Sequence, residues 1–516
     1  MASRAAANAA AAAGRYGKLW GRGCETFTPS ERRVLSVRGE GATNYLQGLV
    51  TCDLLAEPRP PREEYDVDAV AKKAVEDGVG DASADATVEP VVPVAFTSRM
   101  RSACFLDNRG RILTDALLWK RLVGGASDPP KTGEGEEAEE DVEYLIDVPG
   151  DTADDLLTHL KQYKLRRSRV AIGDRSKDCS VHAVYGTLNA EGAPPGYVAS
   201  IDPRHPSLGM RVLSIDSESE AASESESESE SDGGCDSHER RRSRFEALMS
   251  GHFPPANGTY GVIHKLAGVA EGAELTGKTA LECNQESLNA VSFTKGCYLG
   301  QELTARSQYT GTIRKRILPL ILLDVETEVP RPWMTAHMIQ ELGRDAFAND
   351  TFGQAAALDT GGESPPPLPQ ISAPGAGGIV AMLMGSILPL PTTENDGKDV
   401  NLNDEAAGNG ELSRLQIDGE RLMEEVAAVA LPGASIVDKK DGKTIGKIVS
   451  APAPGTTVLL AQMRLDRVGL LGEKWKWTRT NRVVVGESTK ELRYLPYLPL
   501  WWPEIDSTTG KEKESS

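Results

Sequence analysis

Three strongly acidic segments interrupt the chain and limit how it can fold. They span residues 57–93, 126–143 and 215–237 and together carry a charge of −22, whereas the whole 516-residue chain has a net charge of −19. The rest of the sequence is therefore close to neutral, at +3. Acidic segments with few large apolar residues cannot bury enough surface to fold. The folded part is thus expected to be assembled from discontinuous pieces, with these segments as disordered insertions.

Further low-complexity segments extend this pattern. Serine and glutamate alternate in residues 214–237, and a short basic run follows at residues 240–242. We predict a disordered spacer over residues 214–243, and a plain solvated spacer is favoured there over a kinase target. Residues 344–376 and 391–412 are rich in Gly, Pro, Asn and Asp and are predicted to be two more insertions.

Charge and cysteine usage exclude several classes of protein. A near-neutral folded part lacks the basic footprint of a nucleic-acid-binding protein. The seven cysteines are odd in number and form no CxxC pair, so a disulfide framework is not expected and a reducing compartment is favoured. No apolar run approaches the roughly 20 residues that a membrane-spanning helix needs. We therefore predict no membrane span and no nucleic-acid partner.

The N-terminal residues have an unusual composition. Residues 1–24 are rich in alanine, contain arginine and lysine, and lack any acidic side chain before Glu25. This composition is typical of an organelle transit peptide, although an alanine-rich tail has a similar one. Because serine is scarce, the pattern favours a mitochondrial transit peptide over a chloroplast one.

Hydrophobic periodicity predicts short strands and helices between the insertions. Alternation predicts strands, and apolar residues three or four apart predict helices. The predicted strands are residues 34–37, 103–106, 112–119 and 144–148, with a hairpin turn at 107–110; the predicted helices are 42–49 and 151–163. Near the C-terminus, short strands at 435–437, 444–449 and 457–463 predict a small antiparallel sheet or barrel.

The segment of residues 281–316 carries the chemistry. It contains the octapeptide Lys295-Gly296-Cys297-Tyr298-Leu299-Gly300-Gln301-Glu302. Alternation predicts a strand at residues 290–293, Gly296 permits a bend, and a helix is predicted at 298–309. Cys297 would then lie near a helix N-terminus and beside Lys295, and both neighbours favour the reactive thiolate. In contrast, we interpret Cys52, Cys104 and Cys283 as small buried hydrophobic residues.

The octapeptide and the following Thr304-Ala305-Arg306 resemble the signature of a known family. This is the YgfZ-type branch of the glycine-cleavage T-protein (GcvT) superfamily, which includes mitochondrial iron–sulfur cluster assembly factors. Residues 34–54, 105–119, 260–275 and 501–503 resemble other blocks of the same family. The resemblance covers about two-thirds of the chain, and the acidic insertions lie outside it.

The resemblance implies an α+β fold with a GcvT-like folate-binding domain. That domain would comprise residues 25–213 and 244–315, followed by a small antiparallel β-barrel at 316–503 and a tail at 504–516. It implies a central pocket for tetrahydrofolate. The residues assigned to folate binding or to fixing the pocket loop are Glu282, Asn284, Tyr298, Gly300, Gln301, Glu302 and Arg306.

The resemblance also implies a role in iron–sulfur cluster maturation in the mitochondrial matrix. The implied partners are A-type iron–sulfur carriers and client [4Fe–4S] enzymes. Iron–sulfur clusters generally take four protein thiolates, whereas this chain has one well-placed candidate. We therefore hypothesise that Cys297 transiently shares a cluster with the cysteines of a partner, and that Lys295 tunes the thiolate.

Two departures from the family keep other functions open. Aminomethyltransferases carry paired aspartates where this chain has Thr114-Asp115, and Ala270 replaces a proline that is usual in relatives. Folate-dependent one-carbon chemistry needs a positioned acid–base group, so the loss of one carboxylate puts that reaction in doubt. The alternatives are an aminomethyltransferase-like one-carbon transferase and a scaffold whose folate binding is vestigial.

Overall fold

The computed structural model describes most of the chain outside the predicted insertions. The described residues are 23–56, 100–122, 142–185, 196–205, 208–216, 234–251, 253–255, 258–325, 421–453, 457–468, 470–471, 482–496, 499, 501–503 and 505–513. They divide into two compact units. The first comprises Met1–Tyr260 and Glu271–Gly311, and the second comprises Gly261–Ala270 and Thr312–Ser516.

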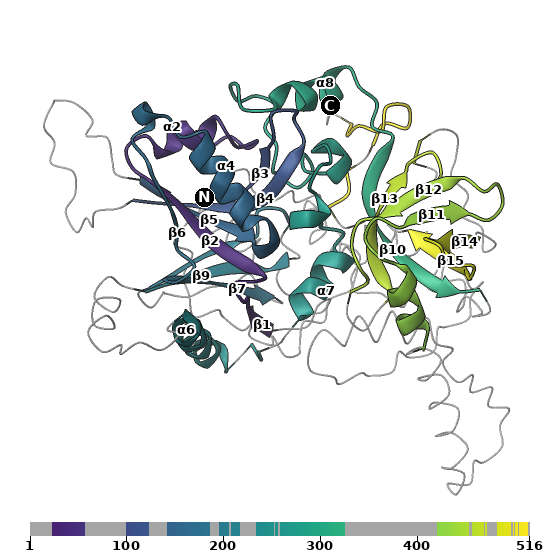
Figure 1. Cartoon of the computed structure of the whole chain (residues 1–516), viewed down its shortest axis with the longest axis horizontal. Coiled ribbons are helices and arrows are strands. Elements are labelled where there is room, and N and C mark those ends of the chain that lie inside the picture. Colours follow the sequence, from purple (N-terminus) through teal and green to yellow (C-terminus); the bar gives the residue numbers. More distant parts are fainter. Residues whose placement is uncertain are drawn as a thin grey trace, which may run out of the picture. The chain divides into compact units, whose positions relative to one another are not determined.

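A five-stranded antiparallel sheet forms one half of the first unit, with strand order β3-β4-β5-β2-β6. Its strands are β2 (Arg32–Arg38), β3 (Met100–Leu106), β4 (Ile112–Leu122), β5 (Val142–Pro149) and β6 (Ala171–Asp174). Helices α2 (Ala42–Gln47) and α4 (Ala153–Gln162) lie over one face of this sheet (Figure 1). Leu46 and Leu156 on these helices join Ile146 on β5 in one buried apolar cluster. The helices therefore close the core on that face.

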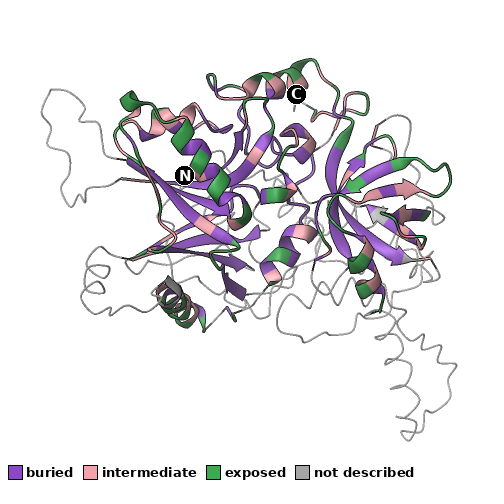
Figure 2. Ribbon diagram, viewed as in Figure 1, coloured by how far each residue is buried: buried purple, intermediate pink, exposed green. Residues whose placement is uncertain are grey.

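A four-stranded antiparallel sheet forms the other half, with strand order β1-β7-β9-β8. Its strands are β1 (Gly23–Thr26), β7 (Cys179–Tyr185), β8 (Tyr197–Ile201) and β9 (Met210–Ile215). Helix α6 (Gly234–Met249) covers this sheet and places Phe245 and Met249 against Val212. Apart from β6, which is partly exposed, the strands of both sheets are mostly buried, whereas the outer faces of the helices are exposed (Figure 2).

The first unit also contains several shorter helices. They are η1 (Gly150–Thr152), η2 (Arg166–Ser168), η4 (Gly272–Glu274), η5 (Leu281–Cys283) and α8 (Gln301–Tyr309). Helix α7 (Thr259–Leu266) starts at the end of one unit and continues into the other.

The second unit contains a closed six-stranded barrel, with strand order β10-β13-β12-β11-β14-β15. Its strands are β10 (Lys315–Asp324), β11 (Ser435–Asp438), β12 (Thr444–Ile448), β13 (Val458–Arg464), β14 (Arg482–Val485) and β15 (Glu491–Pro496). Strand β10 pairs with β13 on one side and with β15 on the other, and this double pairing closes the barrel. Residues 421–429 are helical.

The predicted fold class is confirmed: the chain is α+β and has a small closed antiparallel barrel toward its C-terminus. The hairpin turn at residues 107–110 is also confirmed, since Gly110 N donates to Asp107 O at 3.0 Å. Residues 57–93, 126–141, 217–233, 344–376 and 391–412 lie outside the described residues, as do residues 1–22 of the predicted transit peptide.

The structure differs from the sequence-based boundaries at three places. Gly23 and Cys24, predicted to end the transit peptide, lie in β1, and the Cys24 side chain is fully buried. Val142 and Glu143, predicted to end an insertion, begin the buried strand β5.

Residues 234–243, predicted to be disordered spacer, form the first part of α6. The basic run lies inside this helix, where Arg241 is buried and pairs with Asp216 at 2.5 Å. A tertiary partner thus orders a polar segment that composition alone predicts to be disordered.

Candidate functional site

A turn after α2 forms a platform for the segment that leads into the octapeptide. Thr51 is fully buried, and its hydroxyl donates to Ala290 O at 2.6 Å. Ser292 N donates to Thr51 O at 2.9 Å, and Leu299 N donates to Gly48 O at 2.9 Å. Residues 290–293 were predicted to be a strand, but they form no strand. They are fixed instead by these hydrogen bonds to a turn.

Lys295 links the octapeptide to the same platform. Its ammonium group donates to the carbonyl oxygens of Gln47, Val50 and Cys52, at 2.7, 2.7 and 2.8 Å. Three carbonyl acceptors satisfy all three N–H donors of a lysine. Burial lowers the pKa of Lys295 to about 8, while Cys52 and then Asp53 favour its charged form. The three acceptors of this ammonium group therefore lie in the platform, not at Cys297.

Cys297 lies on a short exposed arch between two buried residues. Lys295 and Tyr298 are buried, whereas Gly296 and Cys297 between them are exposed. The ammonium nitrogen of Lys295 lies 4.9 Å from the centre of the Tyr298 ring, a cation–π contact that joins the two ends of the arch. Helix α8 starts only at Gln301, so Cys297 lies outside its first turn. The predicted helix at 298–309 thus begins three residues later than expected.

The other cysteines whose side chains the structure describes are buried. They are Cys24, Cys52, Cys104, Cys179 and Cys283. Burial raises the pKa of Cys52 to about 11 and that of Cys104 well above its usual value. The interpretation of Cys52, Cys104 and Cys283 as small buried residues is confirmed. Cys297 is therefore the exposed thiol among the cysteines whose side chains the structure describes.

The remaining predicted site residues lie around the octapeptide. Gly300 is the N-cap of α8 and has φ +78°, while Glu302 and Arg306 are exposed on that helix and Gln301 is half-buried. In the preceding segment, Asn284 is buried at the C-terminal end of η5 with φ 61°, next to the half-buried Glu282. These residues frame the arch, and their assignment to folate remains a prediction.

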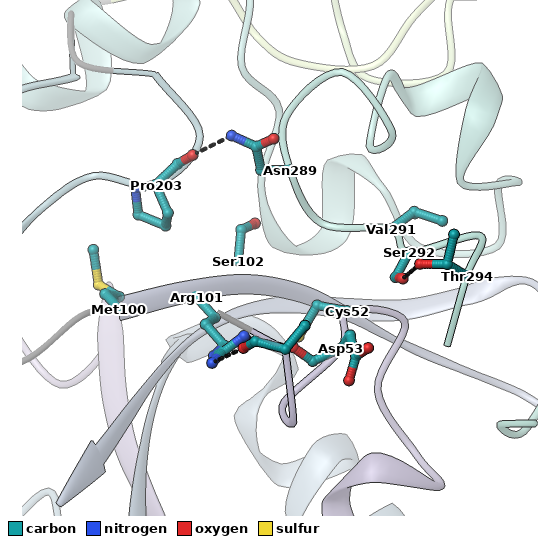
Figure 3. A pocket seen from close by; sticks show the side chains of 11 residues that line it. Cys52, Asp53, Met100, Arg101, Ser102, Pro203, Asn289, Val291, Ser292 and Thr294 are labelled. Carbon is teal, nitrogen blue, oxygen red and sulfur yellow. Dashed lines mark hydrogen bonds between the residues drawn. The ribbon is translucent and has the colours of Figure 1, made fainter. Parts of the chain in front are cut away.

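A pocket opens beside the platform, and four separate parts of the chain line it (Figure 3). Its lining residues are Cys52, Asp53, Ala56, Met100, Arg101, Ser102, Pro203, Asn289, Val291, Ser292 and Thr294. None of the seven residues predicted to bind folate is among them. The pocket instead lies on the side of the platform next to residues 289–294, directly before Lys295.

Polar groups in the pocket are held in place by neighbouring backbone. The Arg101 guanidinium donates to Asp53 O at 2.5 Å and to Ala56 O at 2.6 Å. Although burial opposes it, hydrogen bonds from Gln47 and the following backbone amides lower the pKa of Asp53 below its usual value. Asn289 has φ 59° and donates its amide to Pro203 O at 2.9 Å. The pocket thus offers a fixed cation, a carboxylate and an amide.

Behind the pocket-bearing strands, a buried ionic layer joins the two sheets of the first unit. It combines three arginines with four carboxylates, namely Arg32, Arg204 and Arg211 with Asp115, Asp147, Asp202 and Glu271. Arg32 on β2 pairs with Asp147 at 2.6 Å, and Arg211 on β9 lies 3.5 Å from the same carboxyl group. Buried charges are tolerated only when they are paired in this way.

Asp115 is the carboxylate at the position where aminomethyltransferases carry an aspartate pair. It accepts a hydrogen bond from Gly272 N at 2.8 Å and lies 3.9 Å from Arg204. Burial and then the Glu271 carboxylate raise the pKa of Asp115 to about 6, against the opposing effect of Arg32 and Arg204. Asp115 is not among the pocket-lining residues and is part of the ionic layer.

Neither the residues that line the pocket nor the ionic layer were predicted from the sequence. Their signal was present: Asp147 and Arg211 are single charges within otherwise apolar strands, and such charges need buried partners. Within the described part of the chain, no group of three or more His, Cys, Asp or Glu residues is placed to hold a metal ion. No described helix is both long and apolar enough to span a membrane.

Comparisons with known proteins agree with the octapeptide. No protein-family profile matches the chain. The iron–sulfur cluster assembly factor IBA57 homolog, mitochondrial, of Neosartorya fischeri is 30% identical over 314 residues, covering 57% of this chain and 56% of the relative. The protein of the same description from Mycosarcoma maydis is 29% identical over 295 residues, covering 56% and 55%. The chain thus spans just over half the length of these relatives.

Other matches carry the same description or a related one. The Aspergillus oryzae protein described as an IBA57 homolog is 25% identical over 356 residues, covering 63% of this chain and 66% of the relative. Among solved structures, the glycine cleavage system aminomethyltransferase T from Bartonella henselae aligns with a TM-score of 0.44 at 10% identity, covering 97% of this chain and 91% of that one. On the sequence matches, the chain is similar to the IBA57-like iron–sulfur cluster assembly factors, the branch that the octapeptide indicated.

Proposed function

We propose that the protein is a mitochondrial iron–sulfur cluster assembly factor that helps deliver [4Fe–4S] clusters to client enzymes in the matrix. Its cargo would pass between Cys297 and the cysteines of an A-type carrier. The observation that carries this proposal is the exposure of Cys297 on an arch whose two ends, Lys295 and Tyr298, are buried. The description of the relatives as mitochondrial iron–sulfur cluster assembly factors supports this proposal.

An exposed thiol on a fixed arch suits cluster transfer for two reasons. A thiolate ligates iron only if the partner's cluster can approach it, and Cys297 is exposed where five other cysteines are buried. A protein that contributes one thiolate needs a partner for the remaining ligands, because iron–sulfur clusters generally take four. The arch thus supports a shared cluster over one that this chain holds alone.

The proposal includes tetrahydrofolate as a ligand of the pocket beside the platform. Asp53 and Asn289 offer a carboxylate and an amide that suit the donor and acceptor edge of a pterin ring. Met100 and Val291 offer apolar surface for that ring, and Arg101 offers charge for the glutamate carboxylates of folate. When bound, tetrahydrofolate supplies one-carbon carrier chemistry. The chemistry of these residues supports the proposal, whereas none of the seven residues predicted to bind folate lines the pocket.

Replacement of Cys297 in cells tests the cluster-transfer proposal. Cys297→Ser would be expressed in a strain lacking the endogenous protein, and the activities of aconitase and lipoate synthase would be measured. We expect both activities to remain close to those of the null strain. Cys283→Ser serves as a matched control, because Cys283 is buried nearby and should retain function if it folds. Full rescue by Cys297→Ser would refute the proposal.

Asp115 supports one alternative, a folate-dependent aminomethyltransferase-like one-carbon transferase. A carboxyl group with a pKa of about 6 is suited to acid–base chemistry near neutral pH. This function predicts turnover of a methylene donor by the purified protein. Asp115→Asn should lose that turnover, whereas Cys297→Ser should keep it. Because Asp115 does not line the pocket, this function is the second candidate.

A further inference from the structure

The walls of the pocket and the arch that carries Cys297 share one lysine. One wall contains Cys52 and Asp53, and the other contains Ser292 and Thr294. Lys295 directly follows the second wall in sequence, while its ammonium group binds the carbonyl oxygen of Cys52 in the first wall at 2.8 Å. Its own backbone amide donates to the Ser292 hydroxyl at 3.3 Å. The side chain thus ties the two walls together, although Lys295 is not itself among the lining residues.

The same lysine is one end of the arch. Gly296 and Cys297 are exposed, whereas Lys295 before them and Tyr298 after them are buried. The far end is fixed by Leu299 N, which donates to Gly48 O, and by the buried Tyr298 ring that contacts the Lys295 ammonium group. If the first wall moved relative to the second, the carbonyl cage and one end of the arch would loosen together.

A compact ammonium group is suited to this task. Lysine carries three rotatable donors at a single point, so it can serve three carbonyl groups that converge from one turn. Hydrogen bonds to a charged donor contribute more than neutral ones, and a buried carbonyl group left without its donor is costly. Removing the ammonium group would leave Gln47, Val50 and Cys52 without this partner at once.

We propose that Lys295 is the positioning residue that couples the pocket to the Cys297 arch, so that a ligand held between the two walls orders the arch and fixes how the thiol is presented. This inference rests on the proposed function for its ligand, because tetrahydrofolate is the occupant assigned there. It assigns folate a regulatory role: binding of folate in the pocket changes how the cluster-transfer thiol is presented, and the effect passes through one side chain. Lys295 itself touches neither the cargo nor the ligand.

Hydrogen exchange measured by mass spectrometry on the full chain tests the coupling first without ligand. Lys295→Met should lower protection by about tenfold in peptides covering both residues 47–54 and residues 289–299, the loss expected from about 1.5 kcal/mol of charged hydrogen bonding. Peptides of β5 should keep wild-type exchange and show that the fold is intact. Lys278→Met is the matched control, because Lys278 donates to a single carbonyl, Glu274 O, at 2.6 Å. Loss of protection in residues 295–299 alone would overturn the proposal.

The second comparison adds 5-formyltetrahydrofolate, a stable reduced folate, with calorimetry in parallel. In the wild type, the ligand should raise protection of residues 295–299, although those residues do not line the pocket. In Lys295→Met, calorimetry should still detect binding, but residues 295–299 should gain no protection. Ligand-dependent protection of those residues in Lys295→Met would overturn the coupling. If the wild type bound no folate, the folate part of the proposed function would fail, and the ligand-free comparison alone would still decide the coupling.

Discussion

Gly110 and Gly300 meet backbone to backbone, and this contact holds the β3–β4 hairpin against the start of α8. A Cβ atom at Gly110 would lie 2.6 Å from Gly300 O, and one at Gly300 would lie 2.8 Å from the Cα of Gly110. Both residues have φ +78°, a conformation that other residues rarely adopt. The octapeptide therefore contains a glycine whose role is to let two backbones touch.

Replacing that glycine should destabilise the first unit. Gly300→Ala combines left-handed strain with overpacking, so we expect a loss of about 2–4 kcal/mol in the free energy of unfolding. Urea denaturation followed by circular dichroism measures it. Gly296→Ala is a control within the same octapeptide, because its Cβ atom would meet nothing within 4 Å. Equal stability losses in the two variants would contradict the role assigned to the Gly110–Gly300 contact.

Two carboxylates of the ionic layer should differ in how much their loss destabilises the protein. Asp202 accepts hydrogen bonds from Arg204 on both carboxyl oxygens, at 2.9 and 2.7 Å, so Asp202→Asn removes the two-point partner of a buried guanidinium. We expect that variant to lose about 3–5 kcal/mol of stability. Asp115 lies 3.9 Å from Arg204 and its carboxyl group has a pKa raised to about 6, so Asp115→Asn should be close to neutral at pH 7.5. Thermal unfolding of both variants, with the wild type beside them, checks the contrast.

Asp115 also predicts a pH dependence. Its pKa in the folded protein is about 6, above the ordinary value of 3.8, so the folded state binds the proton more tightly. This contribution to stability is fully present below pH 3.8 and is lost as the pH rises through about 6. The stability difference between wild type and Asp115→Asn should therefore shift in favour of the wild type as the pH falls from 7 to 5. A difference that stays constant over this range would refute the assignment.

His182 should have the opposite effect on acid stability. Its ring is fully buried, hydrogen-bonded to Thr26 at 2.8 Å and to Ser214 at 2.9 Å, and stacked on Phe245. Burial lowers the pKa of His182 well below its ordinary value of 6.5. The unfolded chain thus binds a proton that the folded protein excludes, and stability falls as the pH drops below 6.5 by up to about 1.4 kcal/mol per pH unit. His182→Gln should show a flatter pH profile in urea denaturation between pH 6.5 and 5.

Arg101 should determine the affinity of the pocket for an anionic ligand. Its guanidinium is fixed by two carbonyl groups at the pocket, and a guanidinium has five donors in all. Calorimetry with 5-formyltetrahydrofolate should show binding weakened by about tenfold or more in Arg101→Met, because a hydrogen bond to a charged group contributes about 1.5–3 kcal/mol. Arg109→Met, at an exposed position of the turn beyond the other end of β3, should bind like the wild type. Unchanged affinity in Arg101→Met would contradict the assignment of folate to this pocket.

The octapeptide and the alternation of strands were sufficient to predict the family and much of the local structure. Strand β4, the hairpin turn and α4 follow from patterns within a few residues, where side-chain period and turn chemistry act locally. Three of the six barrel strands, β11, β12 and β13, were predicted for the same reason. The closure of the barrel depends on β10 pairing with β13 and β15, which lie more than a hundred residues away in sequence.

Long-range contacts decided what the local patterns predicted wrongly or missed. Residues 234–243 are polar, yet they are helical because Arg241 finds Asp216 and Ser180 in the folded protein. Lys295 precedes Cys297 by two residues, but its ammonium group binds carbonyl groups near residue 50. Sequence alone thus indicated the family resemblance, many of the strands and the cysteine motif, whereas the exposure of Cys297 came from the structure. Only the tertiary structure decided which groups meet, because a buried charge takes its partners from whatever backbone the fold brings within hydrogen-bonding distance.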